Sequence, residues 1–489
     1  MAQGDRAGPL AVVAGGGVTA SSVAYGHGPG RRSDGIGRAV NHGTATEPRA
    51  LTPLVLAFAG PRHLLFRRVI GESGPATPGR ERAEDGPRRP TPPPAPYRPS
   101  NAPFPCGPSQ TSPGLPGPSR TFPERRETPT MFGSRITFVE GQAGQGPALA
   151  RIADRVRARL TSPRYAALRG ARRPLFTGIG ASYAALAVPV QQLRAAGVVT
   201  QRVLSSEIAT GTAGFDTDCL IAVSQGGRSR ETIAALRCAA PGITRTALLG
   251  VVPSPLGELA DLTLDLGNEP DSYASTIGYT GTVLALDLVA GAIAGRGQDP
   301  WGDIAEQTGA VHRQAAEVVA GLRERAARCI ASDAVAAGAS RASAEEGALL
   351  LREVVRMTAA ASATRNYLHG GMESAGNTLH LVFGDGREIE LARSLAAAGH
   401  LTLLLTTAPA EPSQSLSVIR LPVVPDAVRA VLEAVVLQEL VAQLSAERGV
   451  PIESFVFAND DTKQGGPDRS AFQVAAQAPA DDAARAPSP

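Results

Sequence analysis

The sequence feature that most constrains the fold is a strand, turn and helix pattern that occurs twice. Residues 174–179 form a short apolar run that leads into Gly180-Ala181-Ser182 and then into an apolar helical segment. The same tripeptide returns 158 residues later as Gly338-Ala339-Ser340, again after an apolar run. Gly227-Arg228 likewise recurs as Gly386-Arg387 at an offset of 159 residues. Two matches at nearly one offset, in the same predicted context, indicate an internal duplication.

Strand patterns alternate with helical patterns along the chain. Further strands are predicted at residues 218–224, 244–252 and 262–266. Helices are predicted at residues 148–160, 231–240, 281–294, 316–331, 344–357 and 427–449. Such alternation is typical of parallel sheets covered on both faces, with ligand sites at the carboxyl ends of the strands. We therefore predict an α/β protein with two tandem three-layer α/β/α domains and a C-terminal tail, at residues 131–303, 304–450 and 451–489.

Residues 1–130 differ from the rest of the chain in composition. They contain 22 of the 40 prolines, and 16 arginines against nine carboxylates. Because a proline-rich segment without apolar periodicity cannot bury a core, we predict that it is disordered, or an over-extended reading frame before a true start at Met131. Residues 131–489 contain 32 basic and 36 acidic side chains. This balance argues against nucleic acid as a partner.

The remaining composition indicates a cytoplasmic protein. No apolar run reaches the roughly 20 residues that a membrane span needs, because the stretch at 282–295 contains Asp287. The first 60 residues lack the pattern of a signal peptide. The cysteines have no spacing typical of a zinc site or a disulfide framework, at Cys106, Cys219, Cys238 and Cys329. We predict no membrane association, no metal and no cofactor.

The strongest candidate site spans residues 224–232, where a predicted strand ends in a glycine turn before a helix. Ser224, Ser229 and Thr232 supply hydroxyls there, and the helix N-terminus supplies backbone amides. This combination suits a phosphate group. An ordinary capped turn is the alternative, because Ser and Thr are common N-cap residues. The turn at Gly180-Ala181-Ser182, at the end of an adjacent predicted strand, favours the anion site.

These residues resemble the phosphosugar-binding SIS (sugar isomerase) domain. Residues 131–463 resemble the two-domain isomerase half of glucosamine-6-phosphate synthase, and related amino-sugar-6-phosphate deaminases that lack the glutaminase half. The resemblance implies that the phosphate and sugar are held by Ser182, Ser224, Gln225, Ser229 and Thr232. Gly226 stands where the family usually has a second serine. The segment 273–276 resembles the family's A-S-T turn, which implies that Ser275 and Thr276 line the sugar; plain capping of the next helix is the alternative.

Glu353 and His369 are the candidate acid–base pair. Glu353 lies among leucines and valines of a predicted helix, where burial would raise the pKa of its carboxyl toward that of a general base. His369 lies in a glycine-flanked turn that would expose an imidazole. From the residues alone, a solvated glutamate and a structural histidine are the alternatives. The family separates its catalytic glutamate and ring-opening histidine by the same 16 residues, which implies proton transfer by Glu353 and ring opening by His369 from the second subunit of a homodimer.

Lys463 is the only lysine in the sequence. It lies in a polar tail, where a solvated side chain is the alternative. Relatives end with a lysine that can form a Schiff base with the open-chain ketose, which implies the same role for Lys463. Another lysine of the family, three residues before the glutamate, is replaced by Leu350. No cysteine follows Met1 or Met131, so we expect no glutamine hydrolysis, and amination would need free ammonia or a separate ammonia-supplying subunit.

The predicted function is enolisation of a hexose- or hexosamine-6-phosphate. The enzyme would be an aldose–ketose isomerase or an isomerising deaminase, acting through an enediol or enediolamine on a small phosphosugar. The alternative is a non-catalytic phosphosugar sensor, which the SIS fold also supports when it is attached to a DNA-binding module. No helix-turn-helix pattern precedes the first predicted domain, so a sensor would need a separate partner.

Overall fold

The computed structural model describes the backbone of two short N-terminal strands and residues 135–208, 214–297, 299–457, 459 and 461–466. The two strands, β1 (Ala11–Ala14) and β2 (Gly17–Ala20), pair with each other in antiparallel fashion. They belong to a unit, Met1–Pro116, that is separate from the unit Gly117–Pro489. The rest of the segment 1–130, and with it the prediction made for that segment, lies outside the described residues.

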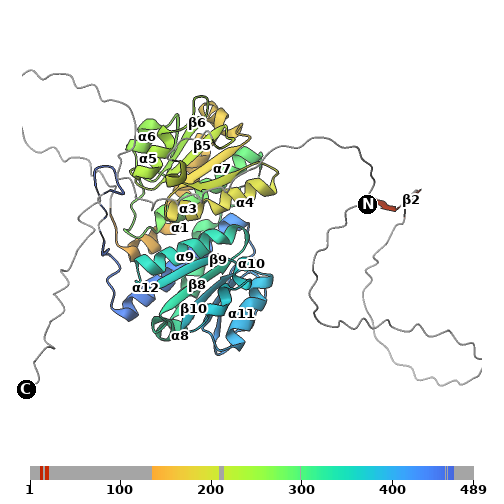
Figure 1. Cartoon of the computed structure of the whole chain (residues 1–489), viewed down its shortest axis with the longest axis vertical. Coiled ribbons are helices and arrows are strands. Elements are labelled where there is room, and N and C mark those ends of the chain that lie inside the picture. The colour runs from red at the N-terminus through yellow and green to blue at the C-terminus, as the bar shows by residue number, and fades with distance from the viewer. Residues whose placement is uncertain are drawn as a thin grey trace, which may run out of the picture. The chain divides into compact units, whose positions relative to one another are not determined.

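The second unit contains two five-stranded parallel sheets with the same strand order (Figure 1). The first sheet consists, from edge to edge, of β4 (Gln201–Leu204), β3 (Pro174–Gly178), β5 (Cys219–Ser224), β6 (Thr244–Leu249) and β7 (Leu262–Asp265). The second consists of β9 (Thr358–Ala363), β8 (Ala331–Ala336), β10 (Thr378–Phe383), β11 (Thr402–Thr406) and β12 (Leu416–Arg420). Along the chain both sheets follow the doubly wound order 2-1-3-4-5. The predicted duplication is therefore confirmed in the topology.

Helices cover these sheets, and the predicted tandem α/β fold is confirmed. The first half contributes α1 (Phe138–Thr161), α3 (Ala181–Ala185), α4 (Ala187–Ala195), α5 (Arg230–Arg237) and α7 (Ile277–Ala294). The second half contributes α8 (Ile304–Ala327), α9 (Arg341–Glu353), α10 (Thr364–Leu368), α11 (Arg387–Ala397) and α12 (Asp426–Arg448). Helix α1 packs on α7 and α8, and α12 packs on α7, α8 and α9. The two halves therefore share one continuous apolar core.

Two helices begin ten or more residues earlier than their apolar periodicity predicts. Helix α1 begins ten residues before the predicted start because Thr137 and Glu140 form a capping box. The Thr137 hydroxyl accepts from the Glu140 amide (3.2 Å), and the Glu140 carboxylate accepts from the Thr137 amide (2.8 Å). Helix α8 begins at Ile304, twelve residues before the predicted start, and buries Ile304, Thr308 and Val311 at helical spacing. Polar residues between these buried positions weaken the pattern in the sequence.

Helix α7 is the central helix of the core. Among the described residues it is the one helix long and apolar enough to cross a membrane, and 83% of that stretch is buried inside the protein. Its single charged residue, Asp287, is completely buried. The carboxylate accepts hydrogen bonds from Gln192 (2.7 Å), Arg296 (2.8 Å) and the Trp301 indole (2.8 Å). A buried charge is tolerated here because it is paired and fully hydrogen-bonded.

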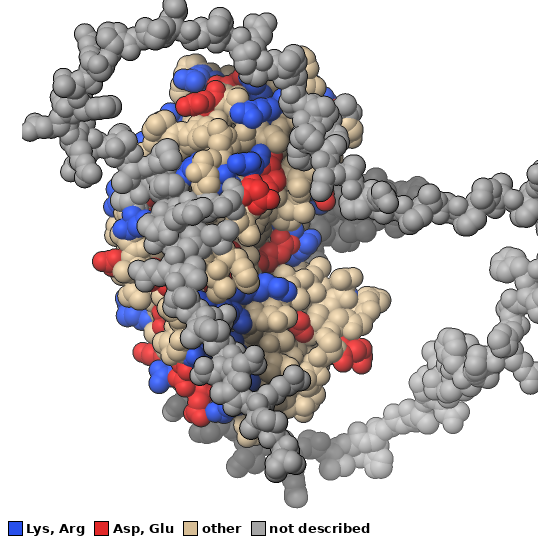
Figure 2. Space-filling view, turned by 60° about the vertical axis from the view of Figure 1, so that its left-hand side comes forward, with Lys and Arg blue, Asp and Glu red and all other residues tan. Residues whose placement is uncertain are grey.

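The surface of the described residues carries charges of both signs. On the face drawn in Figure 2, Lys and Arg side chains lie among Asp and Glu side chains. Many of these charges form ion pairs, among them Arg151–Glu269 (2.6 Å), Arg157–Asp154 (2.6 Å) and Arg341–Glu345 (3.1 Å). Mixed charge of this kind favours a small ligand at one defined site over a polyanion lying along the surface.

In the second half, the turn after β10 is filled by side chains of the protein itself. The Glu388 side chain lies so close to this turn that a Cβ on Gly384 would be 2.7 Å from its carboxylate. Asp385 and Glu433 both accept from the buried Arg429 guanidinium. Burial opposes the ionisation of Asp385, but hydrogen bonds from Arg429 and from the end of β11 outweigh it and hold its pKa at about 2. This copy of the turn therefore contains one ionised carboxylate, Asp385, whose counter-charge is supplied by Arg429 of the same chain.

Candidate active site

The turn between β5 and α5 brings two serine hydroxyls together. Gly227 has a φ of +61°, and a Cβ at this position would lie 2.1 Å from the Ser254 hydroxyl oxygen, so the turn requires glycine. Ser224 and Ser229 are buried, with their hydroxyl oxygens 3.4 Å apart. Ser229 occupies the N-cap position of α5, but its side chain makes no capping hydrogen bond. Both hydroxyls therefore lie at a helix N-terminus, an arrangement that suits an anion.

The other two predicted phosphate ligands lie in different surroundings. Thr232 is fully buried, and its hydroxyl lies 3.1 Å from that of Ser205, which in turn lies 3.0 Å from that of Thr177. The Thr232 hydroxyl thus belongs to a buried chain that supports the start of α5. Ser182 lies in α3, just beyond the carboxyl end of β3, which pairs with β5. The structure therefore places Ser182 at the same sheet edge as Ser224.

Asp271, which the sequence analysis did not single out, organises the predicted sugar-binding turn. It is buried and accepts hydrogen bonds from the Ser275 hydroxyl (2.7 Å), the Thr276 amide and hydroxyl (2.9 Å each) and the Gly278 amide (3.1 Å). The Gln225 amide nitrogen lies 3.4 Å from the same carboxylate. Burial raises the pKa of Asp271, and these hydrogen bonds act in the opposite direction. The hydroxyls of Ser275 and Thr276 are therefore held by Asp271.

Two glycines fix the side chain of Gln225 between the turns. A Cβ on Gly250 would lie 2.4 Å from the Gln225 Oε1 atom, and a Cβ on Gly278 would lie 2.2 Å from its Nε2 atom. No larger residue fits at either position without moving the amide. Oε1 is buried and has no hydrogen-bond partner among the described residues. It is an acceptor that a sugar hydroxyl could satisfy.

Glu353 is the last residue of α9, and its side chain is half-buried. Burial raises the pKa of its carboxyl to about 7, while the Lys463 ammonium acts in the opposite direction. Leu350, one turn earlier, is buried and supplies no charge to this face of the helix. A carboxyl with this pKa is about half ionised at neutral pH, which suits a general base.

Glu346 is a second carboxyl that the sequence analysis missed. It lies two helical turns before Glu353 on the same face of α9 and is 2% exposed. Its Oε2 atom has no hydrogen-bond partner among the described residues. Burial, and then the carboxyls of Glu353 and Asp271, raise the pKa of Glu346 well above its ordinary value and favour the protonated form. The seven-residue spacing, which places Glu346 and Glu353 on the same face of a helix, was the sequence signal that could have identified this carboxyl.

Residues 461–466, here called the C-terminal strap, cross the turn between β5 and α5. This turn carries Ser224 and Ser229 and is called the serine turn below. The Arg230 amide donates to the Thr462 carbonyl (3.2 Å), and the Gln464 amide donates to the Arg228 carbonyl (2.8 Å). These bonds form an antiparallel β-bridge between the strap and the turn. The strap thereby joins the end of the described chain to a turn that lies more than two hundred residues earlier in the sequence.

The β-bridge places Lys463 opposite Ser229. The Lys463 Nζ atom donates to the Ser229 hydroxyl at 3.2 Å. Burial lowers the pKa of the ammonium, and the carboxylates of Glu231 and Glu353 oppose this effect. The structure therefore places Lys463 against the serine turn, and the charge of its ammonium acts on the Glu353 carboxyl, although the sequence around Lys463 has no regular pattern.

The structure does not bring His369 into this site within one chain. His369 is the C-cap residue that follows α10, and it is exposed. Its backbone amide donates to the Asn366 carbonyl (3.1 Å). Between described residues, no hydrogen bond or ion pair connects its imidazole with Glu353 or with the serine turn. The expected role of His369 therefore depends on a second copy of the chain.

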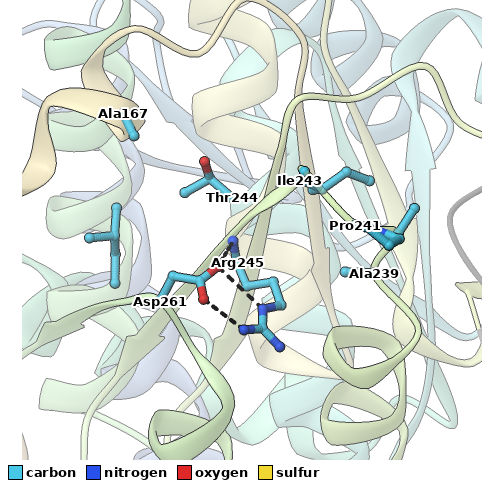
Figure 3. Close-up of a pocket in the computed structure, with 10 residues that line it drawn as sticks. Ala167, Ala239, Pro241, Ile243, Thr244, Arg245 and Asp261 are labelled. Atoms are coloured by element: carbon cyan, nitrogen blue, oxygen red, sulfur yellow. Dashed lines mark hydrogen bonds and ion pairs between the residues drawn. The ribbon is translucent and has the colours of Figure 1, made fainter.

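An open hollow of about 650 Å³ lies at the opposite end of the first sheet (Figure 3). It is lined by Thr244 and Leu262, the first residues of β6 and β7, and by the ion pair of Arg245 with Asp261 (2.6 Å). In Figure 3 the Asp261 carboxylate faces the Arg245 guanidinium. Ligands of doubly wound sheets bind at the carboxyl ends of the strands, so the serine turn is the stronger candidate.

The geometry of the first sheet agrees with a family match. Residues 167–292 match the sequence profile of the SIS domain, and the chain therefore contains a SIS domain. The match covers β3 to β7, the serine turn and most of α7. The second sheet repeats the strand order of the first, so the two sheets together have the architecture of tandem SIS domains. No curated protein matches the chain by sequence.

Several solved structures share this architecture. A candidate phosphosugar isomerase from Clostridium difficile 630 is 19% identical and aligns with a TM-score of 0.57 over 64% of this chain and 94% of its own. The C-terminal domain of glucosamine-fructose-6-phosphate aminotransferase from Francisella tularensis is 18% identical and aligns with a TM-score of 0.56 over 65% of this chain and 98% of its own. Tagatose-6-phosphate ketose/aldose isomerase from Escherichia coli is 17% identical and aligns with a TM-score of 0.55 over 64% of this chain and 93% of its own. At these identities the similarity establishes the fold.

Proposed function

We propose that this protein is a phosphosugar enzyme that enolises a hexose- or hexosamine-6-phosphate, as an aldose–ketose isomerase or an isomerising deaminase. The observation that carries the proposal is the position of Glu353. Its carboxyl, with a pKa of about 7, interacts with the Lys463 ammonium, which is hydrogen-bonded to the serine turn. Ser224, Ser229 and Lys463 would form the anion site, and Glu353 would act beside it as the general base. The SIS fold, shared with phosphosugar isomerases, supports this assignment.

The proposed reaction moves a proton between adjacent sugar carbons. The hydroxyls of Ser224 and Ser229 and the α5 N-terminus would hold the phosphate, with Ser182 beside them. The Glu353 carboxylate would remove the proton from carbon 2 of the open-chain aldose, which gives a cis-enediol, and would return it to carbon 1. A proton moves from oxygen 2 to oxygen 1 in the same conversion. In a hexosamine phosphate the corresponding intermediate is an enediolamine.

We further infer a cytoplasmic homodimer that needs neither metal nor cofactor. His369 of a second copy would open the sugar ring, because the imidazole is exposed and, between described residues, has no hydrogen bond or ion pair with Glu353 of its own chain. If the physiological reaction adds nitrogen, ammonia would have to come from solution or from another subunit. Size measurement in solution, together with loss of ring opening in His369→Ala, would support the dimer. A monomer with full activity would exclude it.

The test of the proposed function is proton NMR in deuterium oxide. The full-length protein is incubated with fructose-6-phosphate, glucose-6-phosphate and glucosamine-6-phosphate, the last with and without ammonia. Enolisation predicts deuterium at carbon 1 or carbon 2, and the product identifies the reaction. Saturable binding without exchange would indicate a phosphosugar sensor. Absence of both binding and exchange for all three sugars would contradict the phosphate site.

The raised pKa of Glu353 predicts a pH dependence of kcat/KM. The base must be deprotonated, so activity is full above the pKa of about 7 and falls as the pH decreases through it, by about tenfold for each further pH unit. The measurement is kcat/KM between pH 5 and 9, because this ratio reports the pKa of the base in the free enzyme. A plateau that extends down to pH 5.5 would show that the base is an ordinary solvated glutamate.

A further inference from the structure

The C-terminal strap is held by the side chain of Arg228. This side chain is buried, and its Nε and Nη2 atoms donate to the Gln464 carbonyl at 2.9 and 2.5 Å. Nη2 also lies 3.3 Å from the Gly466 carbonyl. Gly465 has a φ of +82°, and a Cβ there would lie 2.6 Å from the same Nη2 atom. The strap therefore adopts a conformation that requires glycine and lies directly against the Arg228 guanidinium.

This attachment determines where the Lys463 ammonium lies. Nζ donates to the Ser229 hydroxyl at 3.2 Å, and that hydroxyl lies 3.4 Å from the hydroxyl of Ser224. A hydroxyl can accept from an ammonium and donate to a phosphate oxygen at the same time. A phosphate bound by the two serines would therefore meet the ammonium as well. A charge-assisted hydrogen bond to phosphate is stronger than one between neutral groups.

Gly226 leaves a place for such an additional ligand. The resemblance to SIS enzymes implies a serine at this position, so the turn is one hydroxyl donor short. A Cβ on Gly226 would meet nothing within 4 Å, and the space beside it is therefore open. We propose that the Lys463 ammonium is a ligand of the substrate phosphate, positioned by Arg228, and that it replaces this missing donor. The inference rests on the proposed function, and it differs from the Schiff base that the sequence suggested.

The first test compares phosphate affinities by calorimetry of the full-length protein. Inorganic phosphate and fructose-6-phosphate are the probes. Lys463→Ala is expected to weaken the binding of both by about tenfold to a hundredfold. Lys463→Arg should bind within about threefold of the wild type, because a guanidinium also binds phosphate. The exposed Arg393→Ala is the control for loss of one positive charge. Unchanged affinity in Lys463→Ala would overturn the inference.

The second test restores the missing hydroxyl. In the double variant Gly226→Ser/Lys463→Ala, a serine occupies the open space, and we expect it to recover about fivefold of the lost phosphate affinity. A hydroxyl cannot replace an amine that forms a Schiff base. Addition of fructose-6-phosphate with borohydride would trap such an adduct, and Lys463 is the only lysine that could carry it. A trapped Lys463 adduct, or a double variant no better than Lys463→Ala, would overturn the inference.

The positioning role of Arg228 has a separate readout. Reductive methylation with carbon-13 keeps the charge and gives a single lysine signal, from which the pKa of Lys463 can be measured. Phosphate should raise this pKa in the wild type and raise it less in Arg228→Ala, whereas a purely structural Arg228 would leave the increase unchanged. Arg228→Lys should restore part of the increase in the pKa of Lys463 that phosphate causes. If the wild type binds neither probe, the phosphosugar site fails and this inference fails with it.

Discussion

Glu353→Gln is expected to abolish deuterium incorporation into the sugar, with a rate at least about a hundredfold and up to about ten thousandfold below the wild type. The amide has the size of the carboxyl but cannot accept the proton from carbon 2. Phosphate affinity should stay within about threefold, because the serine hydroxyls and the α5 N-terminus are unchanged. The measurement is the rate of exchange by proton NMR, together with the dissociation constant for fructose-6-phosphate by calorimetry.

The control for this substitution is Glu317→Gln on the exposed side of α8. It removes one carboxylate from a helix without touching the site and should leave the exchange rate unchanged. Glu353→Asp keeps a carboxylate but shortens the side chain by one methylene, which moves the carboxylate away from the substrate. This variant should retain a small part of the activity. If Glu353→Gln exchanges deuterium as the wild type does, another group is the base, and Glu346 is then the next candidate.

Asp271→Ala is expected to have the largest effect on stability, a loss of about 3 kcal/mol or more in the free energy of unfolding. The substitution removes the acceptor for the amides of Thr276 and Gly278 and leaves these donors buried. Each unsatisfied buried donor costs about 1–3 kcal/mol. Urea unfolding of the variant and the wild type measures the difference. A change below about 0.5 kcal/mol would mean that water or a rearranged turn satisfies these donors.

Asp271→Asn provides the matched comparison. The asparagine oxygen can still accept from Thr276, but its amide nitrogen would face the Gly278 amide, which is also a donor. We therefore expect an intermediate loss of about 1–2 kcal/mol. Sugar-phosphate affinity should fall in both variants, since Gln225 loses its contact with the carboxylate. Equal stability of the Asn variant and the wild type would show that one oxygen is sufficient.

Most of the fold could be predicted because its central strands are continuous apolar runs. Strands β5 and β10 are buried along their whole length, and each leads into a glycine turn. The prediction gave residue ranges for four strands of the first sheet but for no strand of the second sheet, and it missed the edge strands β4 and β9, which lie next to β3 and β8. Each pairs with one neighbour only, and their residues are of mixed exposure. An edge strand needs no continuous apolar run, so its sequence carries little signal.

The candidate site was predictable where its chemistry is local. Ser224 and Ser229 lie on one turn. The hydroxyls of Ser275 and Thr276 lie within five residues of Asp271, which holds them, so a closer inspection of residues 271–276 could have identified Asp271. The contact between Arg228 and Gln464 joins residues 236 positions apart. No local pattern encodes such a contact. The location of Lys463 therefore depended on the resemblance until the folded chain placed it beside Ser229.

In the second half, the turn after β10 carries its counter-charges as part of the chain. The Asp385 carboxylate pairs with the Arg429 guanidinium of the same chain, so this charge pair needs no ligand from solution. If the turn of the first half binds the proposed phosphosugar, the ligand stabilises the whole unit by RT ln(1 + [L]/Kd), because both halves share one apolar core. Duplication would thus leave one turn whose contribution to stability depends on the supply of a ligand, and another whose contribution is built into the chain.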